Sequence, residues 1–125
     1  KDGLKYHPET KELYSGETFK IRLGGGKEFE GSYKDGKYDG LWTYWYENGQ
    51  KKYEGIWKDG LSDGFWTNWY ENGQKRSEGT FKDGELDGLY NHWYENGQKE
   101  DEGTFNNEGE FIPSKEWNED GSVDE

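Results

Sequence analysis

The sequence predicts an all-β protein, a repeat array of antiparallel β-hairpins that together form a single elongated, twisted sheet. Glycines recur every 24 residues, Asn-Gly pairs lie between aromatic segments, and no segment carries the 3.6-residue apolar period of a helix. Only 27% of the 125 residues are hydrophobic, yet 18% are Phe, Trp or Tyr. We therefore expect aromatic rings to do most of the packing.

The 24-residue repeat divides the chain. Its unit reads E-G-x-aromatic-K-D-G-x-x-D-G-x-aromatic-x-x-W-Y-E-N-G-Q-K-x-x, and three near-complete copies cover 30–53, 54–77 and 78–101. Residues 1–29 keep fragments of the pattern and are expected to form a divergent N-terminal capping repeat, as terminal repeats often do. Residues 102–125 contain a degraded fourth copy and an acidic tail.

The Asn-Gly pairs predict the register of each hairpin. A two-residue loop at Asn48-Gly49 would pair Tyr44 with Tyr53, Trp45 with Lys52, Leu41 with Ile56, and Trp42 with Gly55. The same register pairs Trp66 with Gly79 and Tyr90 with Gly103. Each repeated glycine would then lie opposite an aromatic ring, which compensates for the side chain that a strand glycine lacks.

Alternation along the strands predicts two apolar faces. One face collects Trp42, Trp66 and Tyr90 with Tyr46, Tyr70 and Tyr94, and the other collects Trp45, Trp69 and Trp93 with Leu41, Phe65 and Leu89. A single sheet has no second layer to cover both faces, so we expect at least one aromatic stripe to be partly exposed or covered by a partner. The alternative is that twist and long Lys, Glu and Gln side chains cover enough of each stripe for a monomer without a partner.

Two kinds of position are candidates for partner binding. Aromatic anchors usually supply most of the binding energy at an interface, and positions that vary between otherwise identical repeats can set specificity without disturbing the fold. The predicted anchors are Trp45, Trp69, Trp93, Phe65 and Leu89, and the repeat-variable positions are Tyr44, Asn68, His92, Tyr53, Ser77 and Asp101.

The composition argues against catalysis and predicts no cofactor and no metal site. His7 and His92 are the only histidines and there is no cysteine, so the usual nucleophile pairs lack their members. The predicted register places His92 opposite Asp101, which we interpret as a cross-strand pair. Asp35 with Asp39, and its counterparts in the next two repeats, flank Gly-containing loops, and turn chemistry explains these aspartates.

The net charge of −12 bounds the choice of partner. It repels nucleic acid and anionic lipid headgroups, so we expect a basic protein partner, no nucleic acid and no direct binding to anionic membranes, while self-association stays open. No apolar segment approaches the roughly 20 residues of a membrane span. Localisation is left open between the bacterial cytoplasm and, if a signal peptide was removed, the periplasm or cell envelope.

The segments Tyr33-Lys-Asp-Gly-Lys-Tyr-Asp-Gly-Leu-Trp and Trp45-Tyr-Glu-Asn-Gly-Gln-Lys resemble the MORN (membrane occupation and recognition nexus) repeat. They are most similar to its bacterial variant, which is associated with antitoxin components of toxin-antitoxin systems. The resemblance covers about residues 30–121. It implies successive β-hairpins, a non-catalytic protein-binding role and, for the bacterial variant, inhibition of a partner toxin in the manner of an antitoxin or immunity protein.

A second functional hypothesis comes from a different class. Aromatic arrays also bind sugars and quaternary ammonium groups, so the chain could be a cell-surface or envelope repeat protein whose aromatic stripe recognises sugar or choline. In the predicted register Trp45 and Trp69 pair with Lys52 and Arg76, whose cations would occupy the ring faces. Trp93, opposite Glu100, would then be the most available ring.

Overall fold

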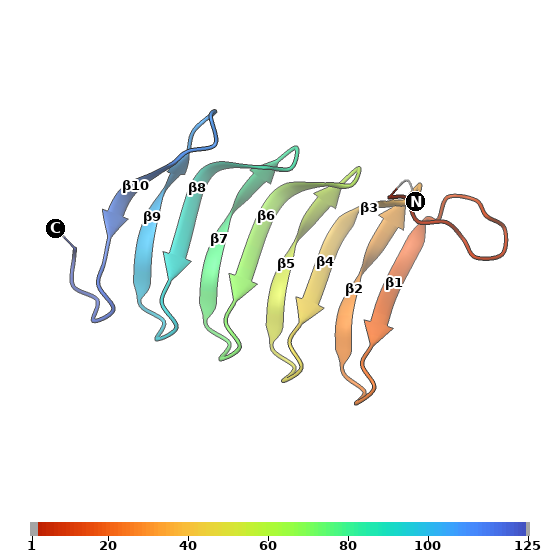
Figure 1. Cartoon of the computed structure of the whole chain (residues 1–125), viewed down its shortest axis with the longest axis horizontal. Coiled ribbons are helices and arrows are strands. Elements are labelled where there is room, and N and C mark those ends of the chain that lie inside the picture. The colour runs from red at the N-terminus through yellow and green to blue at the C-terminus, as the bar shows by residue number, and fades with distance from the viewer. Residues whose placement is uncertain (1–2, 125) are drawn as a thin grey trace.

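The predicted fold class is confirmed: the chain forms one open antiparallel sheet of ten strands (Figure 1). The computed structural model describes residues 3–124, so residues 1, 2 and 125 of the predicted cap and tail lie outside the described part. The strands are β1 (Gly16–Ile21), β2 (Lys27–Lys34), β3 (Lys37–Tyr38), β4 (Gly40–Trp45), β5 (Lys51–Lys58), β6 (Leu61–Trp69), β7 (Lys75–Lys82), β8 (Glu85–Trp93), β9 (Lys99–Phe105) and β10 (Phe111–Glu116).

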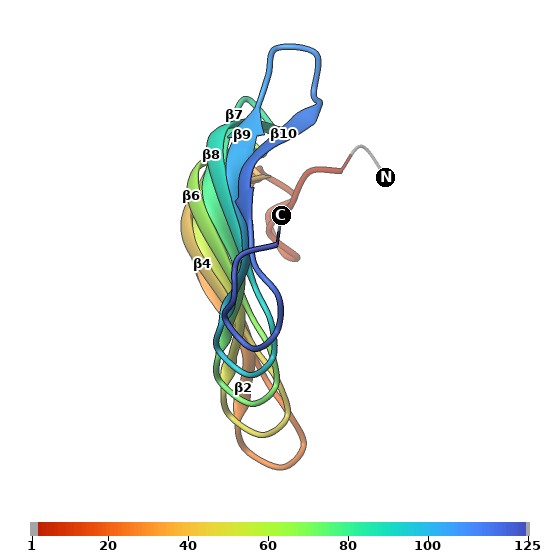
Figure 2. The same ribbon diagram turned by 90° about the vertical axis from the view of Figure 1, so that its left-hand side faces the viewer.

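The strands follow one another across the sheet in chain order. The order is β1-β2-β4-β5-β6-β7-β8-β9-β10, with the short β3 paired to β2. Seen from its end, the sheet is a bowed and twisted single layer, and the N-terminal segment lies on one side of it (Figure 2). Within residues 3–124 there is no helix, and therefore none long and apolar enough to cross a membrane.

The first Asp-Gly pair of each repeat forms the tight two-residue hairpin turn. Asp35 has φ 50° and Gly36 has φ 81°, and the flanking Lys34 and Lys37 pair directly. Positive φ at both central residues is the mark of a type I′ turn, whose twist matches that of the strands. Asp59 and Asp83 repeat the same φ. The aspartates therefore serve turn geometry, as the sequence indicated.

The predicted two-residue Asn-Gly loop is wrong. The Gly49 N–H donates to the Tyr46 carbonyl at 3.0 Å and the Tyr46 N–H donates to the Gln50 carbonyl at 2.8 Å, which makes a three-residue loop with Gly49 at φ 89°. This loop shifts the pairing by one residue, so Trp45 lies opposite Lys51 instead of Lys52. A β-bulge at Lys52 then restores the register, and Tyr44 pairs with Tyr53 as predicted.

Beyond the bulge the predicted register is confirmed in every repeat. Leu41 pairs with Ile56 and Trp42 with Gly55, and the next repeats pair Trp66 with Gly79 and Tyr90 with Gly103. The face that carries Trp42, Trp66 and Tyr90 is called the core face below. The face that carries Trp45, Trp69 and Trp93 is called the open face.

On the core face each ring lies over the glycine of the preceding strand, not over the glycine that follows it in the hairpin. A Cβ placed on Gly55 would lie 1.9 Å from Trp66, and one on Gly31 would lie 2.1 Å from Trp42. Hydrogen bonds from the indole nitrogens explain this direction. The Trp42 Nε1–H donates to the Ser32 carbonyl at 2.9 Å, and the equivalent bond of Trp66 reaches back in the same way.

Rings in contact form the core of the N-terminal half. Trp42 is 1% exposed and touches Phe29, Tyr33, Tyr38 and Tyr44. The Tyr38 ring packs edge-on to Trp42 with centroids 4.5 Å apart. Offset and edge-on pairs of this kind stabilise beyond the area that they bury. Aromatic contacts thus replace the aliphatic core that the composition lacks.

The hairpin turns are joined by a ladder of bonds with the period of the repeat. The Tyr46 hydroxyl donates to the Trp69 carbonyl at 2.7 Å, and the Asn48 side-chain amide donates to the Glu71 carbonyl at 2.8 Å. The Tyr70 and Asn72 side chains repeat both bonds one unit on. In the first hairpin Arg22 stands in for the tyrosine and donates to the Trp45 carbonyl at 2.8 Å. The Tyr-Glu-Asn-Gly-Gln motif is therefore explained by the fold.

Replacing Gly55 by alanine should destabilise the sheet by about 3 kcal/mol, because the new methyl group would overlap the Trp66 ring. Urea unfolding followed by tryptophan fluorescence measures this change. Gly26→Ala is the matched control, since a Cβ at Gly26 meets no atom within 4 Å. Equal unfolding midpoints for the two variants would contradict the packing described here.

Candidate functional site

The structure separates the predicted binding residues onto the two faces of the sheet. Alternation from the core residues Trp42 and Trp66 puts the anchors on the open face. These are Trp45, Trp69, Trp93, Phe65 and Leu89. The repeat-variable positions share the parity of the core residues and lie on the core face. These are Tyr44, Tyr53, Asn68, Ser77, His92 and Asp101. One flat partner cannot contact both sets.

The open face carries a row in which tryptophan and lysine alternate. Trp69 pairs with Lys75 and Trp93 with Lys99. The Lys51 Nζ lies 5.7 Å from the Trp69 ring centroid, and the Lys75 Nζ lies 5.6 Å from that of Trp93. The predicted contacts of Lys52 and Arg76 with tryptophan are wrong because of the bulge. Those two cations lie over the rings of Tyr46 and Tyr70 instead.

Trp45, not Trp93, is the available ring of this row. Trp93 lies between Lys75 and Lys99, whose Nζ atoms are 5.6 and 5.8 Å from its centroid. Among the cation-π contacts of residues 3–124 none involves Trp45. The expectation that Trp93 is the freest tryptophan is therefore overturned.

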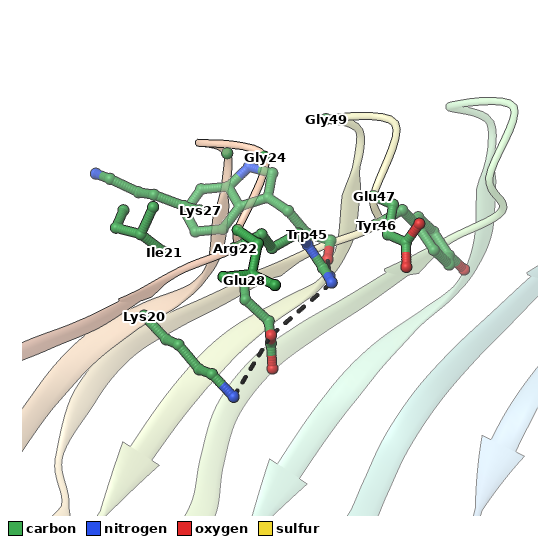
Figure 3. Close-up of a pocket in the computed structure, with 12 residues that line it drawn as sticks. Lys20, Ile21, Arg22, Gly24, Lys27, Glu28, Trp45, Tyr46, Glu47 and Gly49 are labelled. Carbon is green, nitrogen blue, oxygen red and sulfur yellow. Dashed lines mark hydrogen bonds and ion pairs between the residues drawn. The ribbon is translucent and has the colours of Figure 1, made fainter.

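A hollow of about 890 Å³ lies beside Trp45, between the first hairpin loop and the turn at 46–49. Figure 3 shows Trp45 next to this hairpin, with the Glu28 carboxylate joined to both Lys20 and Arg22. The Arg22 Nε is buried and has no hydrogen-bond partner. The hollow therefore combines an aromatic wall with cations that are largely engaged by Glu28.

Beside the tryptophan row, the open face presents an uncovered apolar row. Leu41 is 54% exposed, Phe65 51%, Leu89 71% and Ile112 51%. Between the two rows run Thr43, Glu54, Thr67 and Glu78, which pair across the strands. Glu54 and Glu78 form ion pairs with Lys51 and Lys75. The middle of the open face is therefore apolar or ion-paired.

The unpaired negative charge lies along the ribbon's long edges. Each Asn-Gly turn presents an exposed glutamate, at Glu47, Glu71 and Glu95, and the Asp120-Gly121 turn on the same edge presents Glu119. The opposite edge presents exposed aspartates in the Asp-Gly turns, at Asp35, Asp59 and Asp83, each preceded by an exposed lysine, at Lys34, Lys58 and Lys82. Like charges of this kind focus the field around a surface and attract cations to its rim. The open face is thus an apolar strip with an acidic border.

On the core face the repeat-variable residues form cross-strand pairs, as predicted. The Tyr44 and Tyr53 rings lie 4.4 Å apart, and the Asn68 Nδ2 donates to the Ser77 Oγ at 2.9 Å. In the third repeat the His92 Nδ1 lies 2.7 Å from the Asp101 Oδ1.

Burial raises the pKa of both tyrosines of this row above the ordinary value. Desolvation is the main cause at Tyr44 and Tyr53, and the nearby Tyr38 phenol adds to it in each. A phenolate would have to form among other rings, with little water to solvate its charge. These hydroxyls therefore stay protonated as hydrogen-bonding groups.

Stability should fall as the pH rises above about 10, because the unfolded chain then loses phenol protons that the folded chain keeps. Tyr44→Phe removes the phenol with the most strongly raised pKa and should reduce the loss of stability at alkaline pH. Urea unfolding at a series of pH values from neutral to strongly alkaline measures it. An identical pH dependence for both proteins would refute the role given to Tyr44.

A family model described as a MORN repeat variant matches three segments, 38–59, 63–83 and 86–107, which together make just over half of the chain. No curated protein matches the chain. MORN repeats are commonly protein- or membrane-binding modules. The ladder of hairpins, the glycine-ring packing and the matched repeats agree, and the chain belongs to the MORN-repeat family.

Proposed function

We propose that the chain is a non-catalytic protein-binding module whose open face recognises a basic protein, in the manner of an antitoxin or immunity protein. The observation that carries the proposal is the uncovered apolar row on the open face. Leu89 at 71% exposure and Phe65 at 51% lie on a rigid sheet with no layer over them. The exposed Thr80 and Thr104 alternate with these side chains along the row. An exposed apolar patch rimmed by polar residues commonly marks an interaction site.

Charge favours a basic partner. The net charge is −12, and exposed glutamates without ion pairs, among them Glu71 and Glu95, lie along the edge that carries the Asn-Gly turns. A basic partner could place apolar side chains on the row while its cations reach the acidic rim. Rim charges mainly raise the association rate, whereas buried aromatic and aliphatic groups slow dissociation.

The alternative, recognition of choline or sugar by the tryptophan stripe, is less well supported. Lysines already occupy the cation-π positions over Trp69 and Trp93. A quaternary ammonium group would have to displace them at each ring, and each contact is worth only about 0.5 to 1 kcal/mol at an exposed site. Trp45 alone of the three offers a ring free of such a contact in the described residues.

The double variant Phe65→Ser, Leu89→Ser tests the proposal. The immobilised wild-type chain should retain one stoichiometric basic protein from fractions of the source cell and should capture it more slowly at high salt, because salt screens the rim. The double variant should retain at least about tenfold less, as expected when two interface anchors are truncated.

Leu23→Ser is the matched control, because Leu23 is an equally apolar, fully exposed side chain away from the apolar row. Circular dichroism checks that all variants fold. Undiminished retention of the same protein by the double variant would refute the open-face proposal. An equal loss of retention with Leu23→Ser would refute it as well. Capture of wall polymer alone would favour the envelope role.

A further inference from the structure

The core face contains a polar hollow where its aromatic packing is interrupted. The hollow has a volume of about 450 Å³, within the range of small-molecule sites. Its walls include the side chains of Tyr53, Asn68, Ser77 and Tyr90 from four successive strands, β5 to β8. It is therefore formed where the first repeat meets the second and third, on the opposite side of the sheet from the apolar row.

Two cations border this hollow without an ion-pair partner. Lys52 is the bulge residue of the β4–β5 hairpin and Arg76 that of the β6–β7 hairpin, and both line the hollow. Within residues 3–124 neither forms an ion pair, although the chain has 28 acidic residues. The neighbouring Lys51 and Lys75, which lie on the open face, are both paired with glutamates.

No carboxylate of the described residues lines the hollow itself. The carboxylate of Asp101, beyond its far wall, is held by the His92 Nδ1 at 2.7 Å. Glu47 and Glu71 line an adjoining hollow that Lys52 also lines. Neither glutamate forms an ion pair with Lys52. In the third repeat the bulge residue is Glu100 and not a cation. Among the three full repeats, only the first two therefore place a cation at the bulge.

Neutral groups beside the cations leave a donor and an acceptor unused. Asn68 donates to the Ser77 Oγ at 2.9 Å, so the Ser77 hydroxyl hydrogen is free to donate. The Asn68 Oδ1 accepts no hydrogen bond from the described residues. A ligand hydroxyl both donates and accepts hydrogen bonds. It could donate to the Asn68 Oδ1 and accept from the Ser77 hydroxyl.

We propose that this hollow binds a hydroxylated carboxylate of monosaccharide size, of the uronic acid class. Lys52 and Arg76 hold the carboxylate, Asn68 and Ser77 bond the ring hydroxyls, and Tyr53 and Tyr90 form apolar walls for the sugar's C–H face. Charge-assisted bonds from ammonium and guanidinium groups are the strongest that the hollow offers a ligand.

Titration with sodium glucuronate, followed by isothermal calorimetry and by amide NMR shifts, tests the proposal directly. Saturable binding that perturbs the amides of Asn68 and Ser77 is expected, and it should weaken as salt screens the two cations. Glucose lacks the charge and acetate lacks the hydroxyls, so each should bind at least about tenfold more weakly. Equal affinity for glucose or for acetate, or no saturable binding of glucuronate, would overturn the assignment.

Matched variants locate the site. Lys52→Gln and Arg76→Gln should each weaken glucuronate binding about tenfold, because each removes one charge-assisted contact. Lys51→Gln and Lys75→Gln make the same change of charge one residue earlier on the opposite face, and they should leave the affinity unchanged. Equal losses in both pairs would show a general charge effect and refute this site.

Discussion

A glycine hydrogen occupies the space beneath each central ring, and the rest of the sheet depends on that contact. The position of a Cβ at Gly31, Gly55 or Gly79 lies 1.9 to 2.3 Å from the ring of the following strand, too close for any side chain. The indole hydrogen bonds of Trp42 and Trp66 fix the rings in this place. A single layer of strands thereby obtains a packed face without a second sheet or a helix, and the 24-residue spacing of the glycines is explained by it.

The two faces consequently have different tasks. The core face uses its rings for its own stability, and the polar interruption at Asn68 and Ser77 leaves hydrogen-bonding groups unused, as does the buried Trp57 Nε1–H. The open face is not needed for packing in the same way, since Phe65 and Leu89 remain exposed while lysines cover Trp69 and Trp93. The three-residue loop and the bulge at Lys52 decide which lysine lies on which face, so that Lys51 lies over Trp69 on the open face and Lys52 over Tyr46 on the core face.

Much of this architecture could be predicted from the sequence. The period, the hairpins, the pairing of Tyr44 with Tyr53 and the glycine-ring opposition follow from local turn chemistry and alternation. The bulge could not be predicted, because a two-residue loop and a three-residue loop followed by a bulge give the same pairing beyond Tyr44. That one displaced residue reversed the assignment of the cations and of the available tryptophan. The rings of Trp42 and Trp66 lean toward the preceding strand with indole hydrogen bonds that a pattern of residue types does not specify, and Tyr90 leans the same way without an indole.

Proton NMR of the glycine α-hydrogens tests the central claim most directly. An α-hydrogen held against the face of an aromatic ring is shifted strongly upfield by the ring current. One α-hydrogen each of Gly31, Gly55 and Gly79 should show this shift, while Gly103, which meets the backbone of Ile112 and Pro113 instead of a ring, should not. Ordinary shifts at the first three glycines, or an upfield shift at Gly103 as well, would contradict the account of how this sheet is held together.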